Sequence, residues 1–292
     1  MALDLTAQES AESRPAVRKI HAADLRDALR RGLDDFAAMP SHIVFLGLIY
    51  PIVGIIFGRL ALGYDMLPLV FPLIAGFALV GPVAAIGLYE LSRRREKGLP
   101  ASWKHAFSVL RSRSLPTIVM LGSLLLAIFV AWLVTAQMIY RANFGDLPPL
   151  SPSAFAYDVL YTPAGWNMIL IGNSVGFLFA LIAFAISAVS FPLLIDRNVG
   201  FAAAITTSVN AVIANPGTMA LWAIVVATLL AIGSLPFLLG LTVVVPVLGH
   251  ATWHLYRKLV EPGSGPRPGH RSRLTGRRYA ADFPSVLIPW AR

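Results

Sequence analysis

Two histidines near the end of the chain are the residues whose type and spacing could do chemistry. His250 and His254 are four positions apart, so a helix would present both imidazoles on one face. Two imidazoles on one face can supply two ligands to a metal ion or a haem. A structural metal site needs about four ligands, and the chain has no cysteine to supply a thiolate.

Three more side chains complete the candidate metal ligands, two at the end of an apolar segment and the third, a histidine, at the start of one. They are Glu90, Asp196 and His42. Ionisable groups at the edge of a helix bundle are functional candidates when they face inward. Two simpler interpretations compete: anchors at the lipid–water boundary, where His, Tyr, Trp and Arg are common, or a polar cluster that ties helix ends together. The anchor interpretation is favoured, the polar cluster comes second, and a metal or haem site comes third. We expect no catalytic residue and no cofactor.

The composition indicates whether the chain lies mainly in water or in lipid. Hydrophobic residues make up 57% of the 292 residues, charged residues 13%, and the mean hydropathy is +0.69. Soluble domains are roughly 25% charged. Soluble enzyme folds, disordered proteins and secreted disulfide scaffolds are therefore excluded, and a membrane protein is predicted.

Apolar runs long enough to cross a bilayer as helices predict an all-α polytopic fold with six transmembrane helices. A Thr162-Pro163 cap precedes the fourth helix, and the sequence Gly-Ser-Leu-Pro at 233–236 separates the fifth from the sixth. The predicted spans are 41–62, 66–89, 115–140, 166–195, 216–233 and 236–256. The predicted regions are an N-terminal segment with an amphipathic helix (1–40), a transmembrane domain (41–258) and a basic, disordered tail (259–292).

Each odd-numbered span follows a short helical segment that could lie along the membrane surface. These segments end near Pro40, Pro116 and Pro216. A block of short helix, proline, outward span and return span would then occur three times, as a three-fold repeat of helical hairpins. The alternative is that membrane helices often begin after a proline and an amphipathic lead-in.

Basic residues predict the orientation in the membrane. The segment before the first span carries six Lys and Arg, the loop after the second span seven, the loop after the fourth span one and the tail eight. The opposite side has two, Arg59 and Arg141. Because cytoplasmic loops are enriched in Lys and Arg, both termini are predicted to lie in the cytoplasm. The net charge of +9 is thereby explained without a nucleic acid, since no fold or aromatic platform for one accompanies the tail arginines.

Four strings of the sequence are distinctive: residues 81–94 with Gly-Leu-Tyr-Glu, residues 189–197, Asn215-Pro216, and residues 246–254 with Gly-His-Ala-Thr-Trp-His. These strings resemble an uncharacterised family of bacterial integral membrane proteins, the domain of unknown function 2189. The resemblance extends over about residues 40–260. It implies a multi-span protein of the bacterial inner membrane with no known activity and no catalytic residues to transfer.

The function expected from these patterns is association rather than catalysis. The predicted spans have no Asp, Glu, Lys or Arg near their middles, whereas ion-coupled transporters keep ionisable groups there. No phosphate-binding glycine loop, serine elbow or zinc-binding helix motif occurs.

The leading hypothesis is a non-enzymatic protein of envelope organisation or membrane-complex assembly. Its expected partners are the lipid bilayer and another membrane protein or a second copy. The alternatives are a transporter or channel for a small or lipidic solute, then an enzyme or haem carrier. The pair Asp34-Asp35 is assigned to the solvated face of a surface helix.

The predicted orientation can be tested at the end of the chain. A reporter that works only in the cytoplasm, fused after Arg292, is expected to be active, because the basic tail is held on that side. Reporter activity is measured in whole cells. If a reporter that works only outside the cytoplasm were active at this position instead, the topology would be wrong.

Overall fold

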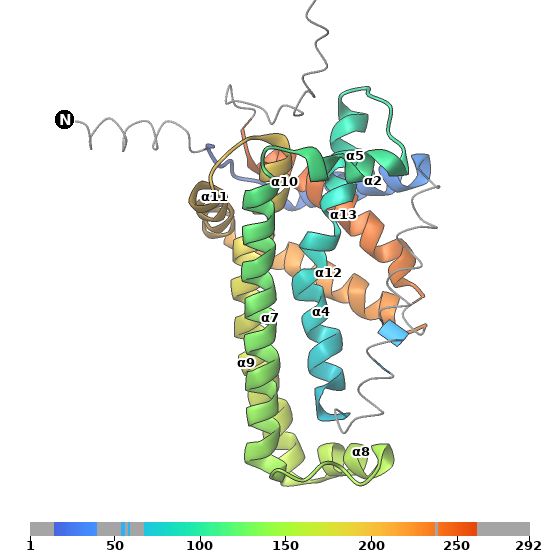
Figure 1. Ribbon diagram of the computed structural model, residues 1–292, viewed down its shortest axis with the longest axis vertical. Helices are drawn as coiled ribbons and strands as arrows, with labels where there is room; N and C mark the ends of the chain where they lie inside the picture. Colours follow the sequence, from blue (N-terminus) through green and yellow to red (C-terminus); the bar gives the residue numbers. More distant parts are fainter. Residues whose placement is uncertain (1–14, 40–53, 56–57, 59–66, 237–238, 262–292) are drawn as a thin grey trace, which may run out of the picture.

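The computed structural model describes residues 15–39, 54–55, 58, 67–236 and 239–261. In this part of the chain the ordered elements are all helices, as predicted (Figure 1). Most of the predicted first span, His42 and the tail from residue 262 lie outside the described residues. The elements are α2 (Ala22–Ala38), the 3-10 helix η1 (Leu67–Leu69), α4 (Val70–Ala84), α5 (Ile86–Glu96), α6 (Trp103–Ala106), the 3-10 helix η2 (Phe107–Arg111), α7 (Leu115–Phe144), α8 (Pro152–Tyr161), α9 (Pro163–Ser187), α10 (Ser190–Asp196), α11 (Phe201–Ala214), α12 (Pro216–Ser234) and α13 (Leu241–Leu259).

Three of the described segments are long and apolar enough to cross a membrane: α7, the segment Pro163–Asp196 formed by α9 and α10, and α12. The predicted cap of the fourth span is confirmed, because the Thr162 hydroxyl accepts a hydrogen bond from the Gly165 N–H at 3.0 Å. The predicted break after the fifth span is also confirmed, because α12 ends at Ser234.

The six-span count stays a prediction. The second predicted span, 66–89, is divided into α4 and α5 by a turn residue at Ala85, three positions after Pro82, which has no N–H to donate. The fourth is interrupted between Ser187 and Ser190, where Pro192 removes another helical hydrogen bond. Short helices precede α7 and α12 as expected, but a three-fold repeat also stays a prediction, since most of its first span is outside the described residues.

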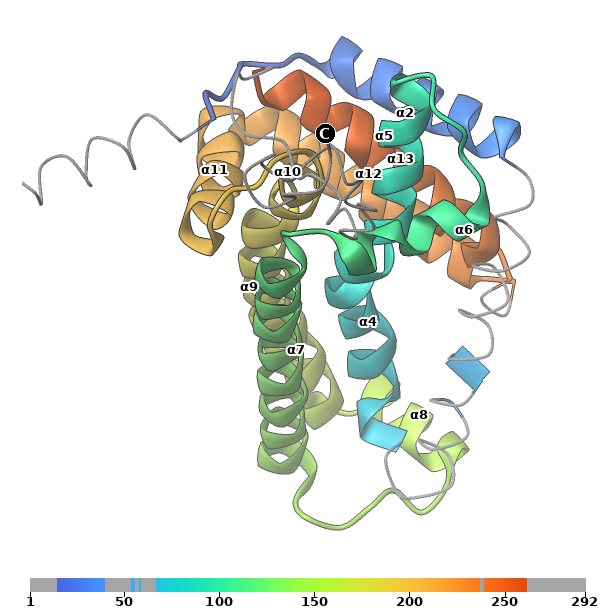
Figure 2. The same cartoon turned by 45° about the horizontal axis from the view of Figure 1, so that its top comes forward.

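Helix α13 lies against both α2 and α5, which are far apart in the sequence (Figures 1 and 2). Two glycines allow this close approach. A Cβ on Gly32 of α2 would lie 2.7 Å from the backbone nitrogen of Ala251, and a Cβ on Gly249 would lie 2.6 Å from Cδ1 of Leu88 in α5. The largest buried cluster of the described residues includes Trp253, Tyr256 and residues of α5 and α10.

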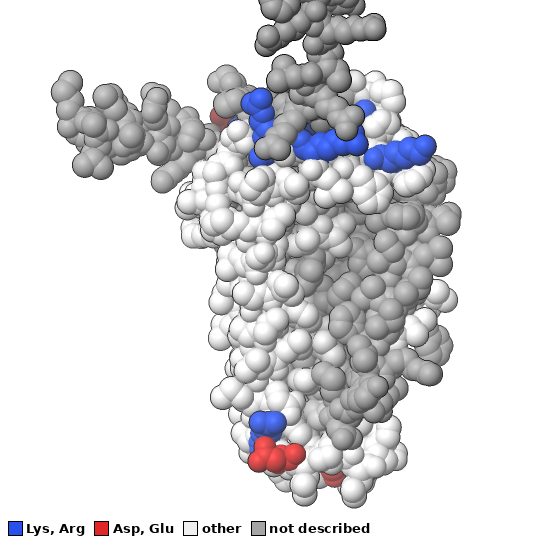
Figure 3. All heavy atoms as spheres, in the orientation of Figure 1, with Lys and Arg blue, Asp and Glu red and all other residues white. Residues whose placement is uncertain are grey.

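Charged side chains gather at the two ends of the described part. Figure 3 shows Lys and Arg over the end where α2 and α5 lie, an uncharged belt along the visible side of the long helices, and a small group at the opposite end. Arg141, in the last turn of α7, pairs with Asp146 at 3.3 Å. The end formed by α2, α5, α10 and residues 250–259 of α13 is called the charged end below.

The glycine contact between α2 and α13 yields a stability prediction. Gly32→Ala is expected to destabilise the fold by about 1–3 kcal/mol, because the added methyl group meets backbone atoms of α13 that cannot move aside easily. Thermal unfolding of the purified protein in mild detergent measures the change. Gly217→Ala is the matched control, because a Cβ there has nothing within 4 Å. Equal melting temperatures for the two variants would contradict the close packing.

Candidate functional site

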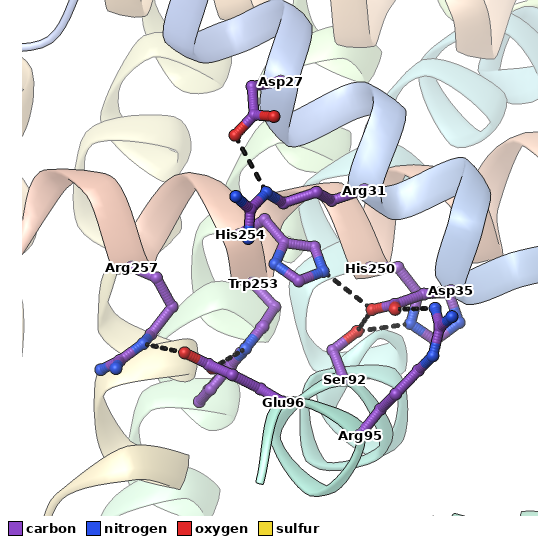
Figure 4. A network of polar contacts seen from close by, with 10 residues as sticks. All are labelled: Asp27, Arg31, Asp35, Ser92, Arg95, Glu96, His250, Trp253, His254 and Arg257. Carbon is purple, nitrogen blue, oxygen red and sulfur yellow. Dashed lines mark hydrogen bonds and ion pairs between the residues drawn. The ribbon is translucent and has the colours of Figure 1, made fainter. Parts of the chain in front are cut away.

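A buried carboxylate joins three helices at the charged end (Figure 4). Asp35 of α2 is 4% exposed. Its Oδ2 accepts a hydrogen bond from the Ser92 hydroxyl of α5 at 2.5 Å and lies 2.8 Å from Nε2 of His254 in α13. Its Oδ1 pairs with the guanidinium of Arg95. The Ser92 oxygen also lies 2.7 Å from Nδ1 of His250. We call these five residues the Asp35 network.

The network determines where its protons lie. The Ser92 hydroxyl has one hydrogen, which it donates to Asp35. Nδ1 of His250 must therefore donate to the Ser92 oxygen, so that nitrogen carries a proton. Burial raises the pKa of the Asp35 carboxyl, but the hydrogen bonds with His254 and Ser92 and the nearby positive charge outweigh it, and the pKa falls below its ordinary value of 3.8.

This proton arrangement does not activate a nucleophile. A catalytic serine gives its proton to a base as its oxygen attacks the substrate. Here the Ser92 hydroxyl donates a hydrogen bond to a carboxylate, His250 donates one to the Ser92 oxygen, and Ser92 has no exposed surface. The Asp35 network therefore holds α2, α5 and α13 together.

A second group of ion pairs links α5, α13 and α10. Glu96 accepts hydrogen bonds from the Trp253 indole N–H and from Arg257, both at 3.0 Å. Arg257 also lies 3.3 Å from Asp196, which accepts the Tyr256 hydroxyl at 2.8 Å. The side chains of α13 therefore contact α5 through Glu96 and α10 through Asp196.

Glu90 belongs to neither group. Its carboxylate pairs with Arg93 at 2.7 Å and with Arg94 at 3.8 Å on its own helix, and it accepts the Ser108 hydroxyl at 3.3 Å. The contact with Ser108 fixes η2 against α5.

The five candidate metal ligands are therefore not assembled together. His250 and His254 share the Asp35 network, whereas Glu90 and Asp196 lie in separate groups, and His42 is outside the described residues. No group of three His, Asp or Glu that could hold a metal ion occurs in the part of the chain that the structure describes. With His250 only 1% exposed, the interpretation of this residue as an interfacial anchor is wrong, and the polar cluster replaces it.

The assignment of Asp35 to a solvated helix face is also wrong. The signal that could have placed it inside is its helical register, because Leu25, Ala28, Gly32 and Asp35 follow spacings of three, four and three and form the buried face of α2. Neighbouring Asp34 is exposed, so only one member of the acidic pair was assigned correctly.

Removal of the Asp35 charge tests the network. Asp35→Asn is expected to lower the free energy of unfolding by about 1–3 kcal/mol, because it leaves buried hydrogen-bonding partners unmatched. Thermal unfolding in mild detergent measures the loss, with Asp34→Asn as the matched control on the exposed position. A loss of the same size in both variants would contradict the role of the network.

The stability that Asp35 contributes should depend on pH. Because the pKa of Asp35 is lowered in the folded state, its stabilising contribution is fully present above pH 3.8 and is lost as the pH falls through the lower pKa of the folded state. The stability difference between the natural protein and Asp35→Asn should therefore shrink as the medium is acidified below 3.8. A difference that grew on acidification would contradict this assignment.

Comparison with known proteins gives one match. No curated protein and no solved structure matches the chain. The matching family is described as predicted integral membrane protein (DUF2189), and the match extends over residues 70–196. This segment includes Ser92, Glu90 and Asp196 but ends before His250 and His254, so the resemblance of the later strings has no support from this comparison. Over residues 70–196, less than half of its length, the chain thus matches DUF2189, the family of predicted integral membrane proteins that the sequence resemblance indicated.

Proposed function

We propose that this protein is a non-enzymatic membrane protein that acts by association, in envelope organisation or in the assembly of another membrane complex. The observation that carries the proposal is a pair of exposed polar side chains on α9, Asn173 and Ser174. The chemistry of a polar group in lipid explains why this pair favours association.

Asn173 lies at the depth where a polar group is most costly. It follows Pro163 by ten residues, which places it about 15 Å along the helix, roughly half the thickness of the hydrocarbon core. Its amide donates to the Ile169 carbonyl of its own helix at 2.7 Å. The side-chain oxygen of Asn173 accepts no hydrogen bond from the described residues. Since lipid provides no donor, another membrane helix is the partner that would satisfy this oxygen.

The long helices also present apolar surface well beyond what they bury. In the most apolar 18-residue stretch of α7, 28% of the residues are buried in the structure, and in that of α12 17% are buried. The remaining surface suits contact with lipid or with other membrane helices. The charged end, by contrast, uses its buried carboxylates to hold its own helices together. This contrast supports an association surface along the spans.

The proposed membrane is the bacterial inner membrane, with the charged end toward the cytoplasm. The positive-inside rule supports this orientation, because Lys and Arg gather at that end (Figure 3). The inner membrane itself is supported by the resemblance to a bacterial family.

A transporter or channel for a small or lipidic solute is the second candidate. One cavity favours the lipidic solute: it lies between α4, α5, η2 and α7, and its lining is almost entirely apolar. An ion path would need polar or ionisable groups along its length.

Substitution on α9 tests association. Asn173→Leu combined with Ser174→Leu is expected to abolish co-purification with a membrane-protein partner or a second copy, because the polar contact is removed. Pull-down in mild detergent and the particle mass from light scattering measure the effect. Thr135→Val is the matched control on α7, since the Thr135 hydroxyl also bonds its own helix, to Ala131. A natural protein that is monomeric and free of protein partners in both measurements would overturn the proposal.

A further inference from the structure

An apolar groove lies beside the charged end, where α4 and α5 meet α7. Its volume is about 540 Å³. Residues of α6 and η2, the short helical segments that precede α7, form another wall of the groove. The groove therefore lies between a candidate span and the basic loop that leads into it.

Small side chains explain why this region is hollow. The lining includes Ala84, Gly87, Ala106, Gly122 and Ser123. A Cβ on Gly87 would lie 3.0 Å from the Cβ of Ala106, so α6 packs directly on the start of α5. A Cβ on Gly122 would lie 3.6 Å from Val83, an ordinary van der Waals contact, so α7 and α4 come close together at this point.

The groove extends toward the lipid-facing side of α7. Leu110, Val119 and Leu126 line it, and each is more than half exposed. The aromatic rings of Trp103 and Phe107, in edge-to-face contact at 6.3 Å, lie at the groove in the basic loop. Aromatic residues in this arrangement are typical of the boundary between hydrocarbon and headgroups.

The loop that forms this wall is basic and has no matching acids. Residues 97–114 contain no Asp or Glu. Lys104, Arg111 and Arg113 are exposed, and none of them pairs with a carboxylate of the described residues. Three other described cations at the charged end, Arg95, Arg257 and Lys258, are paired with acids.

A carboxylate that contacts this loop is already compensated by other cations. Glu90 contacts Ser108 of η2, but Arg93 and Arg94 compensate its charge. The N-terminus of the 30-residue helix α7 follows Arg113 directly and adds positive potential. An anion beside Lys104, Arg111 and Arg113 therefore meets attraction from side chains and from the helix end.

From this juxtaposition we infer that the groove binds one anionic phospholipid, whose acyl chain occupies the apolar lining and whose phosphate is held by Lys104, Arg111 and Arg113. The apolar groove alone would accept any lipid chain. The uncompensated cations select the anionic headgroup, as basic pockets between membrane helices do. This site does not involve α9, so it is independent of the association proposed above.

Native mass spectrometry of the full-length protein tests the site. The detergent-purified protein is stripped of lipid and titrated with phosphatidylglycerol or with phosphatidylcholine, which have the same acyl chains but different headgroup charge. The natural protein is expected to retain one phosphatidylglycerol much more strongly than phosphatidylcholine. Replacement of Lys104, Arg111 and Arg113 by Ala should weaken phosphatidylglycerol binding about fivefold per residue, or roughly a hundredfold together.

Two sets of variants separate the headgroup from the groove. Lys104→Arg, Arg111→Lys and Arg113→Lys together keep the charge and should retain binding. Gly122→Leu should weaken both lipids, because its side chain fills the groove without removing a cation.

The matched control removes three exposed cations on α2 or just before it that also lack described acid partners. They are Lys19, Arg26 and Arg30. This control should bind phosphatidylglycerol like the natural protein. If phosphatidylglycerol binding weakened equally in this control and in the variant with Ala at positions 104, 111 and 113, the proposal would be overturned in favour of a diffuse electrostatic effect. Equal retention of both lipids by the natural protein would overturn it as well. Neither result depends on whether α9 binds another protein.

Discussion

The charged end depends on one constraint: a carboxylate inside a protein must be compensated by donors and positive charge, because desolvation of an uncompensated charge is costly. Asp35 satisfies this constraint with groups from two other helices, Ser92 and Arg95 of α5 and His254 of α13. Helices that are distant in the sequence are thereby held in one register. The close contact of Gly32 with α13 brings the carboxylate within reach of these partners, so packing and electrostatics at this end require each other.

The same constraint separates the molecule into parts with different roles. Buried charges are matched within the chain at the charged end, so these groups are engaged in holding the fold. The described spans have the opposite character, with extensive apolar exposure and isolated polar groups such as Asn173. Surfaces that remain unsatisfied, rather than the saturated network, are where lipid or protein partners gain free energy from binding. Function is therefore expected at the outer surface of the spans.

Local signals in the sequence were sufficient for the helix boundaries that depend on neighbouring residues. The Thr162-Pro163 cap and the start of α7 are set by hydrogen bonds and proline geometry within one turn. The site was less predictable, because the partners of Asp35 are 57 and 219 positions away. An acid on a short amphipathic helix is exposed in most contexts, and only the packing of α2 on α13 reverses that expectation here. His250 and His254 were recognised as a pair, but their common partner was not.

Helix α5 shows how the network and the groove depend on each other. Leu91 lines the groove, and the next residue, Ser92, belongs to the Asp35 network. Successive residues on a helix point about 100° apart, so one turn of α5 serves both. The dependence is unequal: loosening the network would release α5 and deform the groove, whereas none of the partners of Asp35 lines the groove. The buried network is thus the support for the groove, and lipid binding adds to a structure that is already held together.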